Sequence, residues 1–240
     1  MVTTSVNDRD GDSPPGLVIA MDGPSGSGKS TVARRVAAEL GLRYLDTGAM
    51  YRALTWWLRE HEVDVTDTAA VVARLGEPRL AVGTDPSSPR IEVDGTDVAG
   101  PIRTRDISNT VSAVASVPQV REVLIGQQRD IVAAAAATGT GIVAEGRDIG
   151  TVVAPDAQVK VFITASEQVR AQRRSADLAA DPAATVDTTR QEQALRDHRD
   201  AAQSGIAPDA IVIDTSTMDL DAVVRHVVEL ARERRTVTHG

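Results

Sequence analysis

A short apolar run that leads into a glycine-rich loop and then a helical pattern is the feature that most constrains this fold. Residues 17–21 (LVIAM) predict a buried strand. The next residues, 23–31 (GPSGSGKST), contain the spacing G-x-x-x-x-G-K-[ST]. From Ser30 onward, apolar residues recur at a helical period that ends at Gly41. Because a strand precedes the loop and a helix follows it, the spacing predicts a phosphate-binding P-loop.

The residue types of this loop suit the binding of a nucleoside triphosphate. Its glycines let the backbone curl so that N–H groups point at an anion, and the following helix adds the positive end of its dipole. Lys29 can reach the β- and γ-phosphates, and Ser30 can offer its hydroxyl to Mg²⁺. A flexible glycine-serine loop that happens to contain a lysine is the alternative. We expect ATP and Mg²⁺ as cofactors, and the predicted nucleotide-binding residues are Gly23, Pro24, Ser25, Gly26, Ser27, Gly28, Lys29, Ser30 and Thr31.

The remaining patterns predict an α/β fold of the P-loop NTPase type, in which helices flank a parallel sheet. Strand and helix patterns alternate at both ends of the chain, which is typical of parallel strands joined by helices. In the middle, short strands at 80–82 and 91–93, with Asp94-Gly95 as a hairpin turn before residues 96–98, predict an antiparallel insertion. Further elements are expected as strands at 142–144, 159–163 and 211–213, as helices at 104–115, 118–136, 166–176, 189–202 and 219–234, and as loops at 46–48 and 177–188.

Composition limits the partners. The 34 acidic residues outnumber the 26 basic ones, and aromatic residues make up 2% of the chain. A general nucleic-acid binder usually has a basic excess and often stacks bases on aromatic side chains. No apolar run approaches the length of a membrane span, and residues 1–16 lack the apolar core of a signal peptide. We therefore expect a cytoplasmic monomer that binds small molecules, and neither nucleic acid nor a membrane.

A P-loop alone does not identify the group that receives the phosphate. A regulatory GTPase switch would need an N-K-x-D element, which is absent from the sequence. A kinase for a small anionic acceptor would instead need arginines outside the P-loop, because guanidinium groups match phosphate oxygens. Any one arginine is more commonly a solvated surface charge. The candidates at loop and helix positions are Arg52, Arg103, Arg121, Arg147, Arg170, Arg173, Arg174, Arg196 and Arg199.

Seven segments together carry a resemblance to a known family. They are 23–31 (GPSGSGKST), 45–52 (LDTGAMYR), 97–103 (DVAGPIR), 117–121 (VPQVR), 145–153 (EGRDIGTVV), 165–174 (ASEQVRAQRR) and 196–200 (RDHRD). In this order and spacing the chain resembles the bacterial cytidylate kinases, which are nucleoside monophosphate kinases. The resemblance implies ATP-dependent phosphorylation of CMP and dCMP. A kinase for UMP, AMP or shikimate and a regulatory nucleotide-binding switch are the alternatives.

The resemblance also implies a division of the chain. A P-loop core would comprise residues 17–45, 121–165 and 204–235, an NMP-binding insertion would comprise 46–120, and a short lid would comprise 166–203. Residues 1–16 are expected to form a disordered tail.

Carried over by matching position, the resemblance implies roles for individual residues. Lys29, Arg52, Arg147 and Arg174 would stabilise charge on the transferring group, and Arg170, Arg173 and Arg174 of the lid would approach ATP. Arg52 and Arg147 would bind the phosphate of the acceptor, Ser112, Arg121 and Asp148 would face cytosine, and Arg196 and Asp200 would lie over the phosphate and sugar. The complete implied acceptor site is Thr47, Tyr51, Arg52, Arg103, Ser112, Arg121, Arg147, Asp148, Arg196 and Asp200, with Ser30 as a metal ligand.

One segment departs from the family pattern. Family members usually have a further arginine after the Arg-Asp element, whereas residues 201–209 (AAQSGIAPD) have none. Gln203 is the nearest polar substitute, so one phosphate contact is in doubt. Asp22 and Glu145 end predicted strands, where they could hold Mg²⁺ through water or serve as loop caps.

Overall fold

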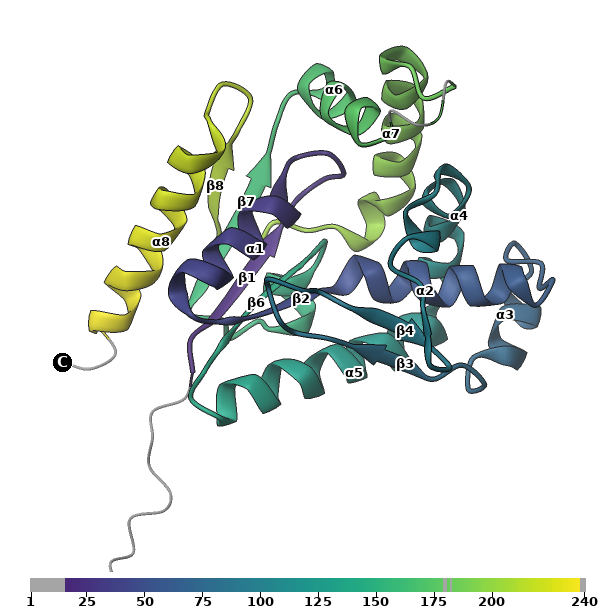
Figure 1. Ribbon diagram of the computed structural model, residues 1–240, viewed down its shortest axis with the longest axis horizontal. Coiled ribbons are helices and arrows are strands. Elements are labelled where there is room, and N and C mark those ends of the chain that lie inside the picture. Colours follow the sequence, from purple (N-terminus) through teal and green to yellow (C-terminus); the bar gives the residue numbers. More distant parts are fainter. Residues whose placement is uncertain (1–15, 179–180, 182, 238–240) are drawn as a thin grey trace, which may run out of the picture.

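A five-stranded parallel sheet forms the centre of the molecule (Figure 1). The computed structural model describes residues 16–178, 181 and 183–237. The strand order is β2-β6-β1-β7-β8, and every neighbouring pair is parallel. The predicted sheet is therefore confirmed. Its strands are β1 (Val18–Asp22), β2 (Arg43–Asp46), β6 (Ile142–Gly146), β7 (Val159–Thr164) and β8 (Ile211–Asp214).

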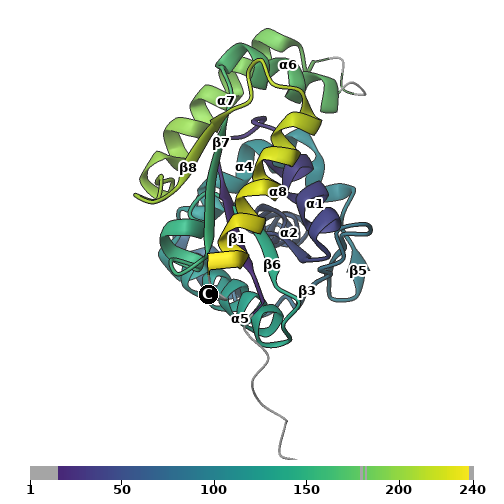
Figure 2. The ribbon, with the colours of Figure 1, turned by 90° about the vertical axis from the view of Figure 1, so that its left-hand side faces the viewer.

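Two layers of helices bury the two faces of the sheet. All five residues of β1 are buried, and successive side chains point to opposite faces. Ile19 and Met21 join the cluster formed with α1 (Lys29–Leu40) and α8 (Leu220–Val237), which lie side by side in Figure 2. Val18 and Ala20 join the cluster on the other face, with α2 (Thr47–Glu60) and α5 (Pro118–Ala137). Burial on both faces explains why β1 is an uninterrupted apolar run.

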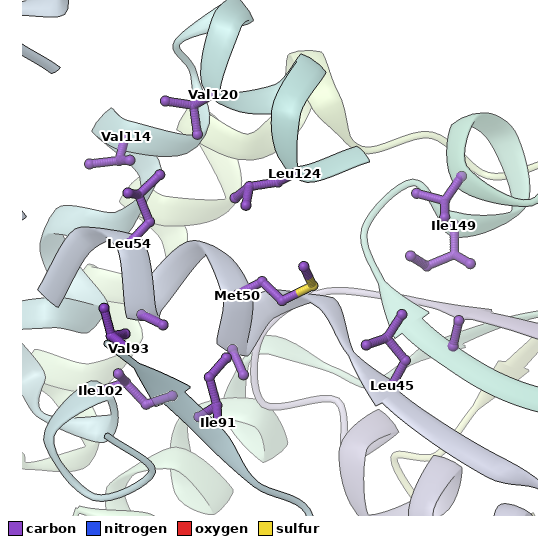
Figure 3. Close-up of a cluster of buried hydrophobic side chains, with 14 of the residues drawn as sticks. Leu45, Met50, Leu54, Ile91, Val93, Ile102, Val114, Val120, Leu124 and Ile149 are labelled. Atoms are coloured by element: carbon purple, nitrogen blue, oxygen red, sulfur yellow. The ribbon is translucent and has the colours of Figure 1, made fainter. Parts of the chain in front are cut away.

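The middle of the chain forms a separate three-stranded antiparallel sheet, as predicted. It pairs β3 (Leu80–Val82), β4 (Ile91–Val93) and β5 (Thr96–Asp97). Figure 3 shows Ile91 and Val93 of β4 pointing toward α2, where Met50 and Leu54 are buried in the same cluster. The insertion thus shares one apolar core with the parallel sheet. It also contains α3 (Thr68–Arg74) and α4 (Arg105–Ala115).

A helical hairpin of α6 (Glu167–Asp177) and α7 (Val186–Asp200) lies over the edge of the sheet where β7 ends (Figure 1). This is the segment expected to form the lid. Short helical turns complete the chain at Pro101–Arg103, Ile149–Val153 and Ala201–Gln203, the second of them a π-helix. In the part of the chain that the structure describes, no helix has the length and apolarity needed to cross a membrane.

Two expectations about local structure were wrong, and one helix was not expected. Thr47 and Gly48 are the first turn of α2 and not a loop, because the Asp46 carboxylate accepts from the Ala49 N–H and caps the helix. Helix α7 begins at Val186 and not at residue 189, because Thr185 caps it in the same manner. Helix α3 was not expected at all.

The expected disordered tail falls almost wholly on residues 1–15, which lie outside the described residues. Gly16 is described and buried, and its N–H donates to the Ala136 carbonyl at 2.8 Å. The described chain therefore begins with a residue fixed against the end of α5.

Candidate nucleotide and acceptor site

A cavity of about 730 Å³ opens at the carboxyl ends of the central strands. Parallel pairing aligns these ends, since Asp22 of β1 is in register with Gly146 and Asp46 of β2 is in register with Glu145 of β6. Open α/β sheets place their ligands at this edge. The cavity is large enough for a nucleotide and extends from the P-loop to α4 and α7.

The P-loop has the backbone of an anion-binding nest. Gly26 has φ of 76° and Gly28 has φ of 89°, values that residues with a Cβ rarely adopt. Helix α1 begins directly afterwards at Lys29, and within the described residues no side chain caps it. Its first N–H groups therefore remain available to phosphate oxygens.

Lys29 lies among charges at the mouth of this loop. Its Nζ is 3.4 Å from the Pro24 carbonyl. Burial, followed by the charge of Arg147, lowers the pKa of Lys29 to about 8, although Glu145 acts in the opposite direction. A phosphate group in the cavity would stabilise the charged lysine, because it would supply a negative charge beside the amine.

Glu145 connects the P-loop to the neighbouring strands. Its carboxylate accepts from the Ser30 hydroxyl at 2.9 Å and from the Tyr44 hydroxyl, while its carbonyl accepts from the Thr47 hydroxyl at 2.7 Å. Burial and the nearby charge of Asp46 raise the pKa of Glu145 to about 7. Ser30, Asp46 and Glu145 thus bring oxygen donors of the kind that Mg²⁺ prefers to the P-loop end of the cavity.

Asp22 is a loop cap, which was one of the two roles expected for it; the other was to hold Mg²⁺ through water. Its two carboxylate oxygens accept from the N–H groups of Ile149 and Gly150, each at 2.8 Å. Burial raises the pKa of Asp22 to about 6. These bonds hold the start of the π-helix and therefore the position of Asp148 immediately before it.

Asp200 lies between two arginines on the far wall of the cavity. It forms ion pairs with Arg147 at 3.3 Å and Arg196 at 3.5 Å, and it accepts from the Ser112 hydroxyl at 2.8 Å. Burial and the charge of Arg147 lower the pKa of Arg196 to about 10. Arg147 also donates to the Gly23 carbonyl at 2.6 Å, which links this wall to the P-loop.

Arg52 and Arg174 meet at one hydroxyl group. Arg52 on α2 and Arg174 on α6 donate to the Ser108 hydroxyl at 2.8 and 2.7 Å. Both guanidinium groups line the cavity. Ser108 was not among the predicted site residues, although it lies one turn before the predicted Ser112 on α4.

Arg121 and Asp148 form an ion pair at 2.5 Å on the cavity wall. Arg121 comes from α5 and Asp148 from the segment after β6, beside Tyr51 of α2. The pair places a guanidinium donor group and a carboxylate acceptor next to one another. Burial raises the pKa of Tyr51 to about 12, so its hydroxyl stays protonated at neutral pH.

Two predicted nucleotide-binding arginines do not line the cavity. Arg170 donates to the Ser25 carbonyl at 3.2 Å and pairs with Asp197 at 2.6 Å. Arg173 donates to the Ser27 carbonyl at 3.0 Å and to Thr215. Both arginines fasten α6 to the outer side of the P-loop, and their contact with ATP stays a prediction.

The cavity brings most of the other predicted residues together. Among the P-loop residues, Gly23, Pro24 and Ser27 do not line it. Gln203, the substitute for the missing arginine, does line it. The predicted residues that line it are Ser25, Gly26, Gly28, Lys29, Ser30, Thr31, Thr47, Tyr51, Arg52, Arg103, Ser112, Arg121, Arg147, Asp148, Arg174, Arg196 and Asp200.

Comparison with known proteins is consistent with this geometry. A family model described as "Cytidylate kinase" matches residues 19–233. The chain is 48% identical over 225 residues to a cytidylate kinase of Streptomyces avermitilis, covering 92% of this chain and 95% of the relative. It is 49% identical to one of Streptomyces coelicolor with the same coverage. A cytidylate kinase of Corynebacterium diphtheriae is 46% identical, covering 90% and 94%.

Proposed function

Because the chain belongs to the cytidylate kinase family, we propose that it transfers the γ-phosphoryl group of ATP to CMP or dCMP, giving ADP and CDP or dCDP. One observation carries this proposal beyond family membership. A single cavity has a P-loop at one end and cationic groups at the other, so it can hold two anionic ligands facing each other. The cationic side chains that line it outside the P-loop include Arg52, Arg103, Arg121, Arg147, Arg174 and Arg196.

Transfer in this arrangement depends on positioning and on charge. Phosphoryl transfer needs neutralisation of the oxygens and alignment of the attacking and leaving groups more than it needs covalent help. Lys29 would approach the β- and γ-phosphates from the P-loop. Arg52 and Arg147 would hold the acceptor phosphate whose oxygen attacks, while Arg174 would approach the transferring group from the lid.

The residues at the end of β6 fit a hydrated Mg²⁺. Magnesium in phosphate sites uses one or two protein oxygens and keeps several waters. The Ser30 hydroxyl would be a direct ligand, and Glu145 would hold a water ligand, since the two groups are 2.9 Å apart. Bound there, the ion would neutralise charge on the β- and γ-phosphates.

The Arg121–Asp148 pair suits cytosine. The base presents an amino donor at N4 beside an acceptor at N3, and uracil reverses both groups. Asp148 would accept from N4 while Arg121 would donate to N3 or O2. Against UMP the carboxylate would meet the O4 acceptor, and unpaired polar groups in a partly desolvated site disfavour binding.

An acceptor panel tests the proposal. ADP release would be measured with MgATP and, in turn, CMP, dCMP, UMP, AMP and shikimate. We expect fast turnover that depends on CMP or dCMP. Preference for another acceptor, or slow hydrolysis of ATP that no acceptor accelerates, would contradict the proposal.

A further inference from the structure

The Ser108 hydroxyl has every hydrogen-bonding position occupied. It donates to the Thr104 carbonyl at 2.8 Å and accepts from Arg52 at 2.8 Å and Arg174 at 2.7 Å. A hydroxyl has one donor and two lone pairs, so the bond to Thr104 turns both lone pairs toward the two guanidinium groups. Ser108 is buried, with 7% of its surface exposed.

The two arginines carry like charges and repel each other, and the shared acceptor oxygen offsets part of this repulsion. In the part of the chain that the structure describes, neither Arg52 nor Arg174 forms an ion pair with a carboxylate. Burial and the charges of Arg196 and Arg174 hold the pKa of Arg52 well below its usual range. A neutral oxygen holds both guanidinium groups without cancelling their charge, whereas a carboxylate there would cancel the charge that a phosphate needs.

The hydroxyl also joins two parts of the molecule that lie far apart in sequence. Arg52 and Ser108 belong to the insertion, on α2 and α4, and Arg174 belongs to α6. Two further contacts on the same side of α4 reach α7: Arg105 pairs with Glu192 at 2.6 Å, and Ser112 donates to Asp200. Of Arg105, Ser108 and Ser112, only Ser108 accepts hydrogen bonds from two arginines that line the cavity within the described residues.

We propose that Ser108 is a positioning residue, whose hydroxyl oxygen sets Arg52 on the acceptor phosphate and Arg174 on the transferring phosphoryl group in one shared geometry. The inference rests on the proposed function, because both arginines act on phosphates of the reaction. Ser108 itself does not contact the reacting atoms. Its removal should therefore weaken the capture of CMP and slow the transfer step while leaving the binding of ATP at the P-loop unchanged.

Four single substitutions test this role. Ser108→Ala removes the acceptor oxygen, and Ser108→Cys replaces it with a weak acceptor of similar volume. Ser108→Thr keeps the hydroxyl. Thr110→Ala is the matched control, because Thr110 on the same helix also donates to the carbonyl four residues earlier, that of Asp106, but holds no arginine.

Steady-state rates would be measured with CMP varied at saturating ATP and with ATP varied at saturating CMP, alongside thermal melting. We expect Ser108→Ala and Ser108→Cys to lower kcat/KM for CMP about tenfold or more, the size expected for hydrogen bonds to charged groups. The KM for ATP should stay near that of the wild type, and Ser108→Thr should restore most of the loss. The Cys variant preserves volume, so the test does not depend on the Ala variant folding.

The outcomes separate this inference from the proposed function. A wild-type protein without CMP-dependent ADP release refutes the proposed function itself. An active wild type whose Ser108→Ala and Ser108→Cys variants match Thr110→Ala refutes the positioning role. If kcat/KM falls equally for CMP and for ATP and the melting temperature also falls, Ser108 only supports the fold. That result would overturn the inference as well.

Discussion

Replacing Lys29 with methionine should stabilise the free protein while removing most of its activity. The lysine carries a positive charge in a half-buried site beside Arg147, and its pKa falls from 10.5 to about 8. That difference corresponds to about 3 kcal/mol of unfavourable free energy for keeping the amine charged. Solvent screens part of it because the side chain is only half-buried, so we expect a gain of roughly 1–2 kcal/mol in the free energy of unfolding at pH 7.

The sign of the pH dependence follows from the same pKa. Below pH 8 the amine is charged in the folded and unfolded states, and the whole penalty is present. Between pH 8 and 10.5 the unfolded chain holds a proton that the folded protein has released, so wild-type stability rises with pH through this window. The advantage of Lys29→Met should therefore be largest near pH 7 and should shrink at pH 9.5.

Urea unfolding without nucleotide measures the gain in the free energy of unfolding at pH 7 and its decrease at pH 9.5. Arg232→Met on α8 is the control, since that side chain is exposed and pairs with Glu39, at the end of α1 away from the P-loop. Its effect should stay within about 0.5 kcal/mol. A Lys29→Met variant that is no more stable than the wild type at pH 7, or an advantage that does not shrink at pH 9.5, would refute the reasoning. Turnover by the folded variant should fall by a factor of about 10² or more.

Three further predictions concern the cavity. Asp148→Asn should lower kcat/KM for CMP and narrow the ratio of CMP to UMP, measured with both substrates; an unchanged ratio would remove Asp148 from base recognition. Gln203→Arg should lower the KM for CMP and make it more sensitive to salt, whereas a KM that stays constant at all ionic strengths would show that the side chain turns away. Gly146→Ala should lower the melting temperature, because a Cβ there would lie 2.5 Å from the Thr47 hydroxyl and 2.8 Å from Ile149; an unchanged melting curve would contradict this.

Local sequence patterns predicted the frame of the fold well. The strand at β1, the helix that follows the glycine-rich loop and the hairpin turn at Asp94-Gly95 depend on neighbouring residues only, and all three are confirmed. The helix boundaries that were wrong depend on single caps. Asp46 and Thr185 each accept a backbone N–H and so extend a helix into a segment whose composition suggested a loop.

The sequence could predict which residues line the cavity, but it could not predict which of them form ion pairs with one another. Family resemblance placed Arg121, Asp148 and Asp200 in one site, yet no local pattern tells which arginine meets which carboxylate. Arg147 pairs with Asp200 and not with its neighbour Asp148, because that pairing depends on how α7 lies over the sheet. The π-helix after Asp148 escaped prediction for the same reason, since the carboxylate that holds it comes from β1.

The fastening of α6 to the P-loop has a consequence for how the protein is made. Carbonyls of Ser25 and Ser27 are held by Arg170, Arg173 and Thr215, which are synthesised long after them. At ribosomal rates of about 5–20 residues per second, roughly seven to forty seconds separate the synthesis of the two residues in each of these bonds. These bonds to the loop can therefore form only after the chain has been extended well beyond it.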